Sequence, residues 1–187
     1  MGRPQEAMAE IRRAQQLDPL SPIIRTDIGF QLYYTRQYDQ AIEHLRITLE
    51  MNPNFPLAHL WLGRAYQQKG LYAEAIAEFN QAGNVLRDWP VTIAAIGHVQ
   101  GKAGKRAEAL KTLEQLKKLS ARRYVTAYGV ALVYAGLGDR NQAIAWLNKA
   151  VEERTHWLVW LKLDPRWDEL RSDARFQQLV GRVGFPQ

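Results

Sequence analysis

The sequence contains no cysteine among its 187 residues. This absence excludes disulfide bridges, thiolate metal sites and cysteine nucleophiles, and it fits a reducing compartment. No apolar run reaches the roughly 18 residues that a membrane-spanning helix needs. The opening GRPQEAMAEIRRA has the pattern of an amphipathic helix and not that of a secretory signal peptide. We therefore expect a folded protein with a cytoplasmic location.

The sequence also lacks the residue patterns of an active site. Its four histidines, His44, His59, His98 and His156, never form an i, i+4 pair, and no HExxH motif occurs. Carboxylates such as that of Glu152 fall at ordinary exposed helical positions. We expect no enzymatic activity, no bound metal ion and no cofactor.

A helical pattern with a fixed period runs through most of the chain. In residues 56–89, one apolar stripe at helical spacing precedes Gly70 and a second follows it. The first stripe consists of Ala58, Leu62, Ala65 and Tyr66, and the second of Ala75, Ile76, Phe79 and Ala82. The register of Ala75 returns in steps of 34 residues at Ala7, Ala41, Ala109 and Ala143. Two short amphipathic helices cannot bury both stripes alone, so neighbouring repeats must stack on one another.

This repeat resembles the tetratricopeptide repeat (TPR), a helix–turn–helix unit of the same period, over residues 2 to about 155. A small residue recurs in each first helix, at Gly29, Gly63, Gly97 and Ala131. Glycine disfavours a helix by about 1 kcal/mol relative to alanine, so its recurrence indicates that the helices pack closely there. The tryptophan usual in the family's first helix is replaced by Arg25, His59, Ile93 and Ala127.

The resemblance implies an all-α fold, a right-handed superhelical solenoid of antiparallel helix pairs closed by a C-terminal capping helix. We expect a single domain over residues 1–187, with a partial repeat (1–21), four repeats (22–55, 56–89, 90–123 and 124–157) and a C-terminal cap (158–187). Outside the repeat at 56–89, the predicted helices are 4–17, 22–35, 38–51, 90–103, 106–119, 124–137, 140–153, 156–163 and about 173–183. The second helix of the 56–89 repeat is expected to run on past Ala82.

Both ends of the sequence suggest a module of a larger protein. The first repeat lacks its first helix, which leads us to expect a fragment. The segment LKLDPRWDELRSDARFQQLVGRVGF is similar to the closing segment of bacterial signalling proteins that carry TPR arrays. In such proteins the array follows a winged-helix DNA-binding domain, a serine/threonine kinase or a nucleotide cyclase. The likeness implies the sensory or scaffolding part of a bacterial regulator and does not indicate which effector accompanies it.

First helices of a TPR array line a concave groove, so their outward side chains predict a partner-binding site. By register these are Asp27, Phe30, Tyr33, Tyr34, Leu60, Trp61, Arg64, Gln67, Gln68, His98, Lys102 and Tyr128. Large aromatics and arginine are frequent interface anchors, and Arg64, His98 and Lys102 favour acidic groups. Alternatively, some of these aromatics only pack between neighbouring repeats. We hypothesise a protein–protein interaction scaffold that binds a peptide segment or a partner domain in this groove.

Two alternative functions stay open. In the first, the incomplete N-terminal repeat stacks on a second copy and forms a homo-oligomer. In the second, residues 101–123 attract an anionic polymer, because their eight basic and two acidic side chains leave an excess equal to the chain's net charge of +6. No aromatic side chain interleaves with this basic segment to stack on bases, which disfavours nucleic acid.

Overall fold

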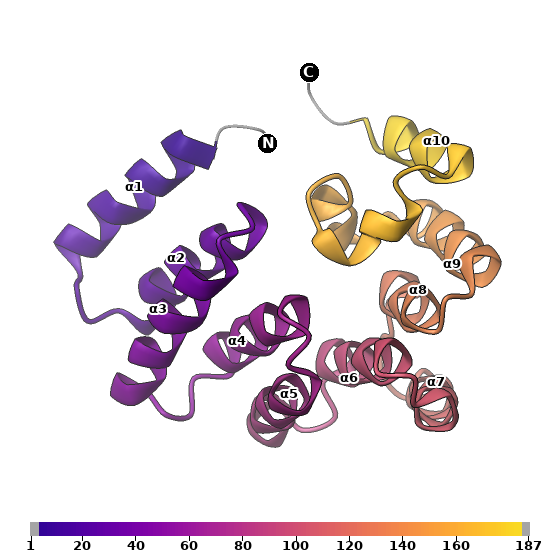
Figure 1. Ribbon diagram of the computed structural model, residues 1–187, viewed down its shortest axis with the longest axis horizontal. Coiled ribbons are helices and arrows are strands. Elements are labelled where there is room, and N and C mark those ends of the chain that lie inside the picture. The colour runs from indigo at the N-terminus through magenta and orange to yellow at the C-terminus, as the bar shows by residue number, and fades with distance from the viewer. Residues whose placement is uncertain (1–3, 185–187) are drawn as a thin grey trace. The chain divides into compact units, whose positions relative to one another are not determined.

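The computed structural model describes residues 4–184, which form helices and turns with no β-strand among them. By their internal contacts the residues divide into two compact units, Met1–Asp88 and Trp89–Gln187, which we call unit 1 and unit 2. Figure 1 shows the order of the helices along the chain. The predicted all-α helical-repeat fold is confirmed.

Unit 1 contains five helices that pack in sequence order. They are α1 (Pro4–Leu17), α2 (Pro22–Tyr34), α3 (Tyr38–Met51), α4 (Pro56–Gln68) and α5 (Tyr72–Leu86). The pairs α2–α3 and α4–α5 form the helix–turn–helix units, and α4 also packs against both α2 and α3. The lone helix α1 contacts α2 and has no fully buried residue.

Unit 2 contains two further pairs and a C-terminal segment. Its elements are α6 (Pro90–Lys102), α7 (Arg106–Leu119), α8 (Ala127–Gly136), α9 (Arg140–Glu152), the 3₁₀ helices η1 (His156–Trp160) and η2 (Pro165–Leu170), and α10 (Ala174–Val183). Helix α8 packs along α6 and α9, α10 contacts α9, and η2 contacts α8.

The repeated sequence positions have repeated structural roles. Proline starts α2, α4 and α6, where its fixed φ suits the first helical turn and no amide donor is needed. The turn inside each pair has a left-handed residue at Arg36, Gly70, Gly104 and Gly138, with φ of 64°, 75°, 75° and 73°. Glycine adopts this conformation without strain. In the first turn, Arg36 adopts it in place of a glycine.

The predicted packing role of the small residues is also confirmed. Ala41, Ala75, Ala109 and Ala143 are all 0% exposed, as the repeat register requires. A Cβ atom on Gly29 would lie 2.4 Å from the Leu45 side chain, and one on Gly63 would lie 2.6 Å from the Phe79 ring. A Cβ on Gly97 would lie 2.8 Å from the Thr112 side chain. These glycines therefore make room for side chains of the neighbouring helices.

Most predicted helix bounds agree with the structure to within one residue, and α5 continues past Ala82 to Leu86 as expected. Two expectations were wrong. The helix predicted over 124–137 begins only at Ala127, because the Thr126 hydroxyl caps it by accepting a hydrogen bond from the amide of Gly129 (3.0 Å). The helix predicted over 156–163 is the short 3₁₀ helix η1, and the chain turns at Asp164 because Pro165 disfavours a helical residue before it.

Some sequence expectations fall on the ends of the chain. Residues 1–3 of the partial repeat and Phe185 of the closing segment lie outside the described residues. The division of the chain into repeats and a cap stays a prediction. Within the described part, no helix is long and apolar enough to cross a membrane.

Candidate protein-interaction surfaces

Helices α2 and α4 of unit 1 bring four aromatic side chains together. Phe30, Tyr33, Tyr34 and Trp61 form this aromatic cluster. The ring centroids of Phe30 and Trp61 are 4.6 Å apart and nearly perpendicular, and Phe30 meets Tyr34 in the same way at 4.9 Å. Edge-to-face pairs of this kind are favourable because a positive ring edge meets a negative ring face. The cluster is a rigid group and not a row of independent side chains.

The next turn of α4 adds a cation to the cluster. The guanidinium carbon of Arg64 lies 4.3 Å from the centroid of the Trp61 ring, within the range of a cation–π contact. The side chain of Arg64 is buried, and Leu60 beside it is also buried. Gln67 is buried as well, and its Oε1 has no hydrogen-bond partner among the residues that the structure describes.

Little of this predicted site faces solvent in unit 1. Tyr33 is 0% exposed, and Tyr34 and Trp61 are below a tenth exposed. Phe30 and Gln68 are half-buried, and Asp27 is exposed. Although Asp27 is exposed, surrounding protein atoms partly desolvate its carboxyl group, which raises its pKa. Of the predicted site residues in unit 1, only Asp27, Phe30 and Gln68 therefore remain accessible, and we call these three residues the accessible edge.

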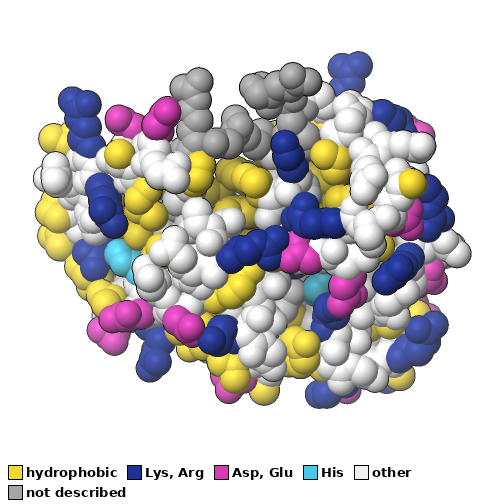
Figure 2. All heavy atoms as spheres, turned by 45° about the horizontal axis from the view of Figure 1, so that its top comes forward, with side chains coloured by type: hydrophobic (Ala, Val, Ile, Leu, Met, Phe, Trp, Pro, Cys, Tyr) yellow, Lys and Arg dark blue, Asp and Glu magenta, His cyan; other side chains and the backbone are white. Residues whose placement is uncertain are grey.

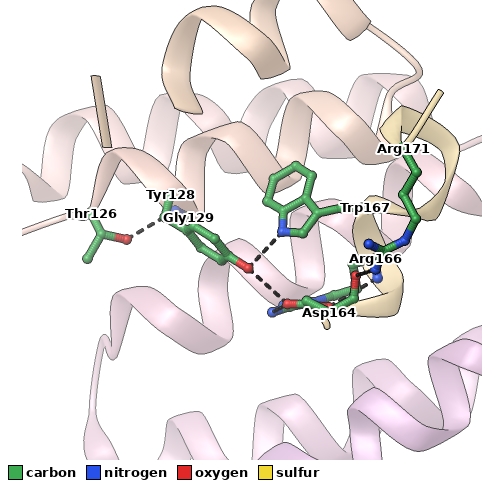
Figure 3. A network of polar contacts seen from close by, with 7 residues as sticks. All are labelled: Thr126, Tyr128, Gly129, Asp164, Arg166, Trp167 and Arg171. Atoms are coloured by element: carbon green, nitrogen blue, oxygen red, sulfur yellow. Dashed lines mark hydrogen bonds and ion pairs between the residues drawn. The ribbon is translucent and has the colours of Figure 1, made fainter. Parts of the chain in front are cut away.

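In unit 2 the predicted site residue Tyr128 contacts the chain's own C-terminal segment. Its hydroxyl donates a hydrogen bond to Asp164 Oδ2 (2.9 Å) and accepts one from the indole N–H of Trp167 (2.7 Å), as Figure 3 shows. The rings of Tyr128 and Trp167 also meet edge to face at 5.3 Å. Both aromatic side chains are buried. This position of the predicted groove is thus occupied from within the chain.

A buried ion pair holds the segment in place. Arg166 contacts Asp164 through two nitrogens, with Nε 2.9 Å from Oδ1 and Nη2 2.5 Å from Oδ2. The two side chains are 1% and 0% exposed. Arg171 donates from Nη2 to the Asp164 carbonyl oxygen (3.2 Å) and from Nη1 to the Lys162 carbonyl oxygen (2.7 Å). Charges so deeply buried stabilise the fold only while they stay paired.

His98 and Lys102 of α6 lie beside the same segment. Lys102 forms an ion pair with Glu169. His98 is 1% exposed, and neither ring nitrogen has a hydrogen-bond partner among the described residues. Burial, together with the smaller effect of the positive charges of Arg166 and Lys102, lowers the pKa of His98 to about 3. His98 is therefore neutral at physiological pH.

Sequence reasoning missed the residues of the C-terminal segment that fill this region. Asp164, Arg166 and Trp167 lie in an Asp-Pro-Arg-Trp run whose pattern predicts only a helix stop. The available signal was the Pro165 that follows Asp164, because an aspartate before proline often caps a turn. The Asp164 carboxylate does so here by accepting a hydrogen bond from the amide of Arg166 (3.1 Å).

Comparison with known proteins identifies the repeat. Two family models described as tetratricopeptide repeat match residues 29–84 and 126–154. The chain is a tetratricopeptide-repeat array. Human tetratricopeptide repeat protein 13 is 34% identical over 82 residues, which are 44% of this chain and 9% of that protein. The chain thus spans about a tenth of this relative's length.

Solved structures agree with the fold. A TPR protein of Thermus thermophilus superposes with a TM-score of 0.67 at 20% identity, covering 96% of this chain and 91% of that one. YrrB, described as a TPR protein with an unusual peptide-binding site, superposes with a TM-score of 0.53 at 15% identity. The match covers 92% of this chain and 90% of that one. A chain of the APC/C hetero-tetramer Cut9–Hcn1 superposes with a TM-score of 0.67 at 14% identity, covering 97% of this chain and 36% of that one. Because the sequence identities are 20% or lower, these superpositions show a shared fold only.

The family supplies a coarse function. TPR arrays are protein–protein interaction scaffolds that are in general non-enzymatic, and their partners are proteins. The face in Figure 2 has lysine and arginine side chains interspersed with acidic and apolar ones. Charge of one sign therefore does not dominate that face.

Proposed function

We propose that the chain is a protein-interaction module of a larger bacterial regulator and that a partner segment binds at the accessible edge of the aromatic cluster. The observation that carries this proposal is the half-buried Phe30 ring, fixed by Tyr34 and Trp61, beside the exposed carboxylate of Asp27. Rigid aromatic anchors lose little conformational entropy on binding. The edge belongs to the predicted concave groove.

The chemistry of this edge favours a partner with an apolar side chain followed by a basic group. Asp27 and Phe30 are three residues apart in α2, so they lie on the same helix face. Arg64 is buried, His98 is neutral and Lys102 is paired with Glu169, so these three side chains offer little charge to an acidic ligand.

The test is a cross-linking pull-down from source cells with wild type, Phe30→Ala and Asp27→Lys. We expect a protein retained by wild type to be lost with Phe30→Ala and strongly reduced with Asp27→Lys. Gln40→Lys, on the exposed surface of α3, is the matched control for added positive charge. Circular dichroism verifies that each variant is folded. Equal retention by wild type and Phe30→Ala contradicts the proposal.

The regulator role rests on the likeness of the closing segment to those of bacterial signalling proteins. The sequence of the full-length gene product tests it directly. An effector domain encoded in the same chain supports the role, and a chain that consists of TPRs alone contradicts it.

A second candidate, self-association, is favoured by an apolar edge where α1 joins α2. Leu17, Leu20 and Ile23 are 82%, 68% and 51% exposed. Sedimentation analysis over a range of concentrations tests it. Self-association through this edge requires a dimer that the variant Leu17→Glu/Leu20→Glu abolishes, whereas a monomer at all concentrations excludes it.

A further inference from the structure

One position of the repeat reaches back to the proline of the preceding turn in both helix pairs of unit 1. His59, in the first turn of α4, has its Nε2 atom 2.8 Å from the carbonyl oxygen of Pro53. One period earlier, Arg25 of α2 donates from Nη1 to the carbonyl oxygen of Pro19 (3.1 Å). Donors and prolines are each separated by the period of 34 residues, so the two contacts are equivalent. We call this contact the turn clasp.

The clasp at His59 has an acceptor at each ring nitrogen. Nδ1 lies 2.6 Å from Oε2 of Glu78 on α5, and Nε2 faces the Pro53 carbonyl oxygen. An ionised carboxylate and a backbone carbonyl have no hydrogen to donate, so each contact requires an N–H group on the ring. A neutral imidazole has one N–H group and an imidazolium has two. Both contacts therefore form together only when the ring is protonated.

Burial makes the loss of either contact costly. The side chains of His59 and Glu78 are 11% and 22% exposed. No backbone amide of residues 4–184 donates to the Pro53 carbonyl, so within this part of the chain the imidazole is its donor. A buried polar group that loses its partner pays the cost of its desolvation. The proton on His59 thus connects the α3–α4 turn to α5.

The surroundings favour this proton. Burial by itself lowers the pKa of His59, but the hydrogen bonds to Glu78 and Pro53 and the charge of Glu78 outweigh it, so the pKa is raised. Among the helices packed against α4, Arg46 of α3 and Glu74 of α5 have opposite charges and act on Tyr66.

The charged residues of α2 lie elsewhere. Arg25 contacts Pro19 and acts on His44, and Asp27 is exposed. Glu78 is the charged side chain whose field acts on His59.

The equivalent positions show that the repeat uses different donors here. The Arg25 guanidinium keeps its charge at physiological pH, and His44 stands one period before Glu78 in place of a carboxylate. In unit 2 the position holds Ile93 and Ala127, which have no polar side chain. The first helix pair therefore has a permanent donor, and the second has a titratable one.

We infer that the turn clasp at His59 is a proton-operated switch, in which the imidazolium ties the α3–α4 turn to α5 and loss of its proton releases one end. A neutral ring keeps one N–H group, so either Pro53 or Glu78 then loses its donor. Because the pKa is raised, the clasp is closed at pH 6.5 and opens as the pH rises through the folded value. The Arg25 clasp stays closed at both pH values.

A ¹⁵N NMR titration of the histidine rings in the whole chain tests the protonation. At pH 7 we expect two protonated ring nitrogens in His59 and one in the neutral His98, with His59→Gln assigning the signals. The matched variant is Glu78→Gln, whose amide has the same shape but can donate to Nδ1. A neutral ring then satisfies both neighbours, so the titration midpoint of His59 should fall below that of wild type.

Hydrogen exchange tests what the proton does. The amides of Ala58 and His59 donate to the Phe55 carbonyl where α4 begins. After correction for intrinsic exchange, their protection should fall about three- to tenfold as the pH rises through the titration, because one hydrogen bond is lost. His59→Arg supplies a permanent cation, as at Arg25, and should keep the protection constant. The Arg25 amide, which donates to Ser21, is the internal control.

Several results would overturn the inference. In the titration they are a single ring proton on His59 at pH 7, a midpoint at or below the ordinary value of about 6.5, and a midpoint that Glu78→Gln leaves unchanged. In the exchange experiment they are protection that does not change with pH in wild type and a loss of protection in a folded His59→Arg variant.

Discussion

In unit 1 the first helices carry large aromatic side chains at positions where the first helices of unit 2 carry small residues. Ala95 lies one period after Trp61, and Gly136 lies three periods after Tyr34. The consequence is a different kind of helix contact. A Cβ on Gly63 would meet the Phe79 side chain, whereas a Cβ on Gly136 would lie 2.3 Å from the carbonyl oxygen of His98. The two contacts belong to different register positions, because Gly63 recurs in unit 2 as Gly97, where an added Cβ would also meet side chains, whereas Gly136 stands in the register of Tyr34.

The units also differ in how they treat a buried histidine. In unit 1, His59 Nδ1 lies 2.6 Å from Glu78 Oε2, and Nε2 lies 2.8 Å from the Pro53 carbonyl oxygen. Burial by itself lowers the pKa of His59, but the hydrogen bonds to Glu78 and Pro53 outweigh it, so the pKa is raised. In unit 2, His98 has no such acceptor and its pKa is lowered. Burial has opposite effects depending on the available acceptor.

The largest expected effect of a substitution concerns the ion pair of unit 2. Asp164→Ala leaves Arg166 buried and without its carboxylate, which should lower the free energy of unfolding by about 3–5 kcal/mol. The matched control in unit 1 is Asp39→Ala, which removes an exposed ion pair with Lys69 and should cost less than about 1 kcal/mol. Urea unfolding measures both. Similar losses of unfolding free energy for the two variants would contradict the distinction between the buried and the exposed ion pair.

The next effect tests the glycine contacts. Gly136→Ala forces α8 away from the His98 backbone and should destabilise the protein by about 3 kcal/mol. Gly63→Ala would place its Cβ 2.6 Å from the Phe79 ring and 3.0 Å from the Ala75 carbonyl oxygen, and its gain in helix propensity of about 1 kcal/mol partly offsets the clash. Its loss should be smaller. Chemical denaturation compares them, and a larger loss for Gly63→Ala would show that the Phe79 ring cannot yield.

The two histidines should have opposite effects on stability as pH changes. The pKa of His98 is about 3 when folded and about 6.5 when unfolded. Between these values the unfolded chain binds a proton that the folded chain does not, so stability falls below pH 6.5 by at most about 1.4 kcal/mol per pH unit. His59 has a raised pKa, so its contribution is present below pH 6.5 and is lost as the pH rises through its folded value.

The measurement is the free energy of unfolding at pH 5 and pH 7.5. Relative to wild type, His98→Gln should reduce the loss on acidification, and His59→Gln should increase it. If both variants shift the difference in the same direction, the assignment of opposite pKa shifts is wrong.

The smallest expected effect is at the turns, where the two units are alike. Gly70 and Gly138 have φ of 75° and 73°, and a Cβ at either would meet nothing within 4 Å. Alanine there introduces only backbone strain, so each variant should lose about 1 kcal/mol. Gly181→Ala, in open space within α10, should instead gain up to about 1 kcal/mol. Thermal unfolding distinguishes the expected losses of stability from the expected gain. Unequal losses at Gly70 and Gly138 would show that the turns of the two units are not equivalent.

Local sequence patterns predicted the helices well because each depends on a few adjacent residues. Proline at 22, 56 and 90 sets a helix start, and a glycine at 70, 104 and 138 sets a turn. The same patterns failed at 156–163, where helical spacing of apolar residues occurs in a 3₁₀ segment. The short run before Pro165 cannot hold a stable α-helix without tertiary support.

The candidate site was harder to predict because helical register fixes which face a side chain occupies but not what covers that face. Tyr33 and Arg64 fall on the predicted face and are buried. An apolar depression lined by residues of α7, α8 and α9 was not predicted either, because its lining comes from three helices and its opening depends on where α8 packs.

The sequence by itself determined the repeat, its helix pairs and the buried alanines, because a period of 34 residues restricts the local geometry of each unit. Only the tertiary structure decided which first-helix side chains remain accessible. Tyr128 is covered by Asp164, 36 residues later, and Lys102 pairs with Glu169, 67 residues later. Such contacts depend on the folded path of the chain, and no periodic pattern encodes them.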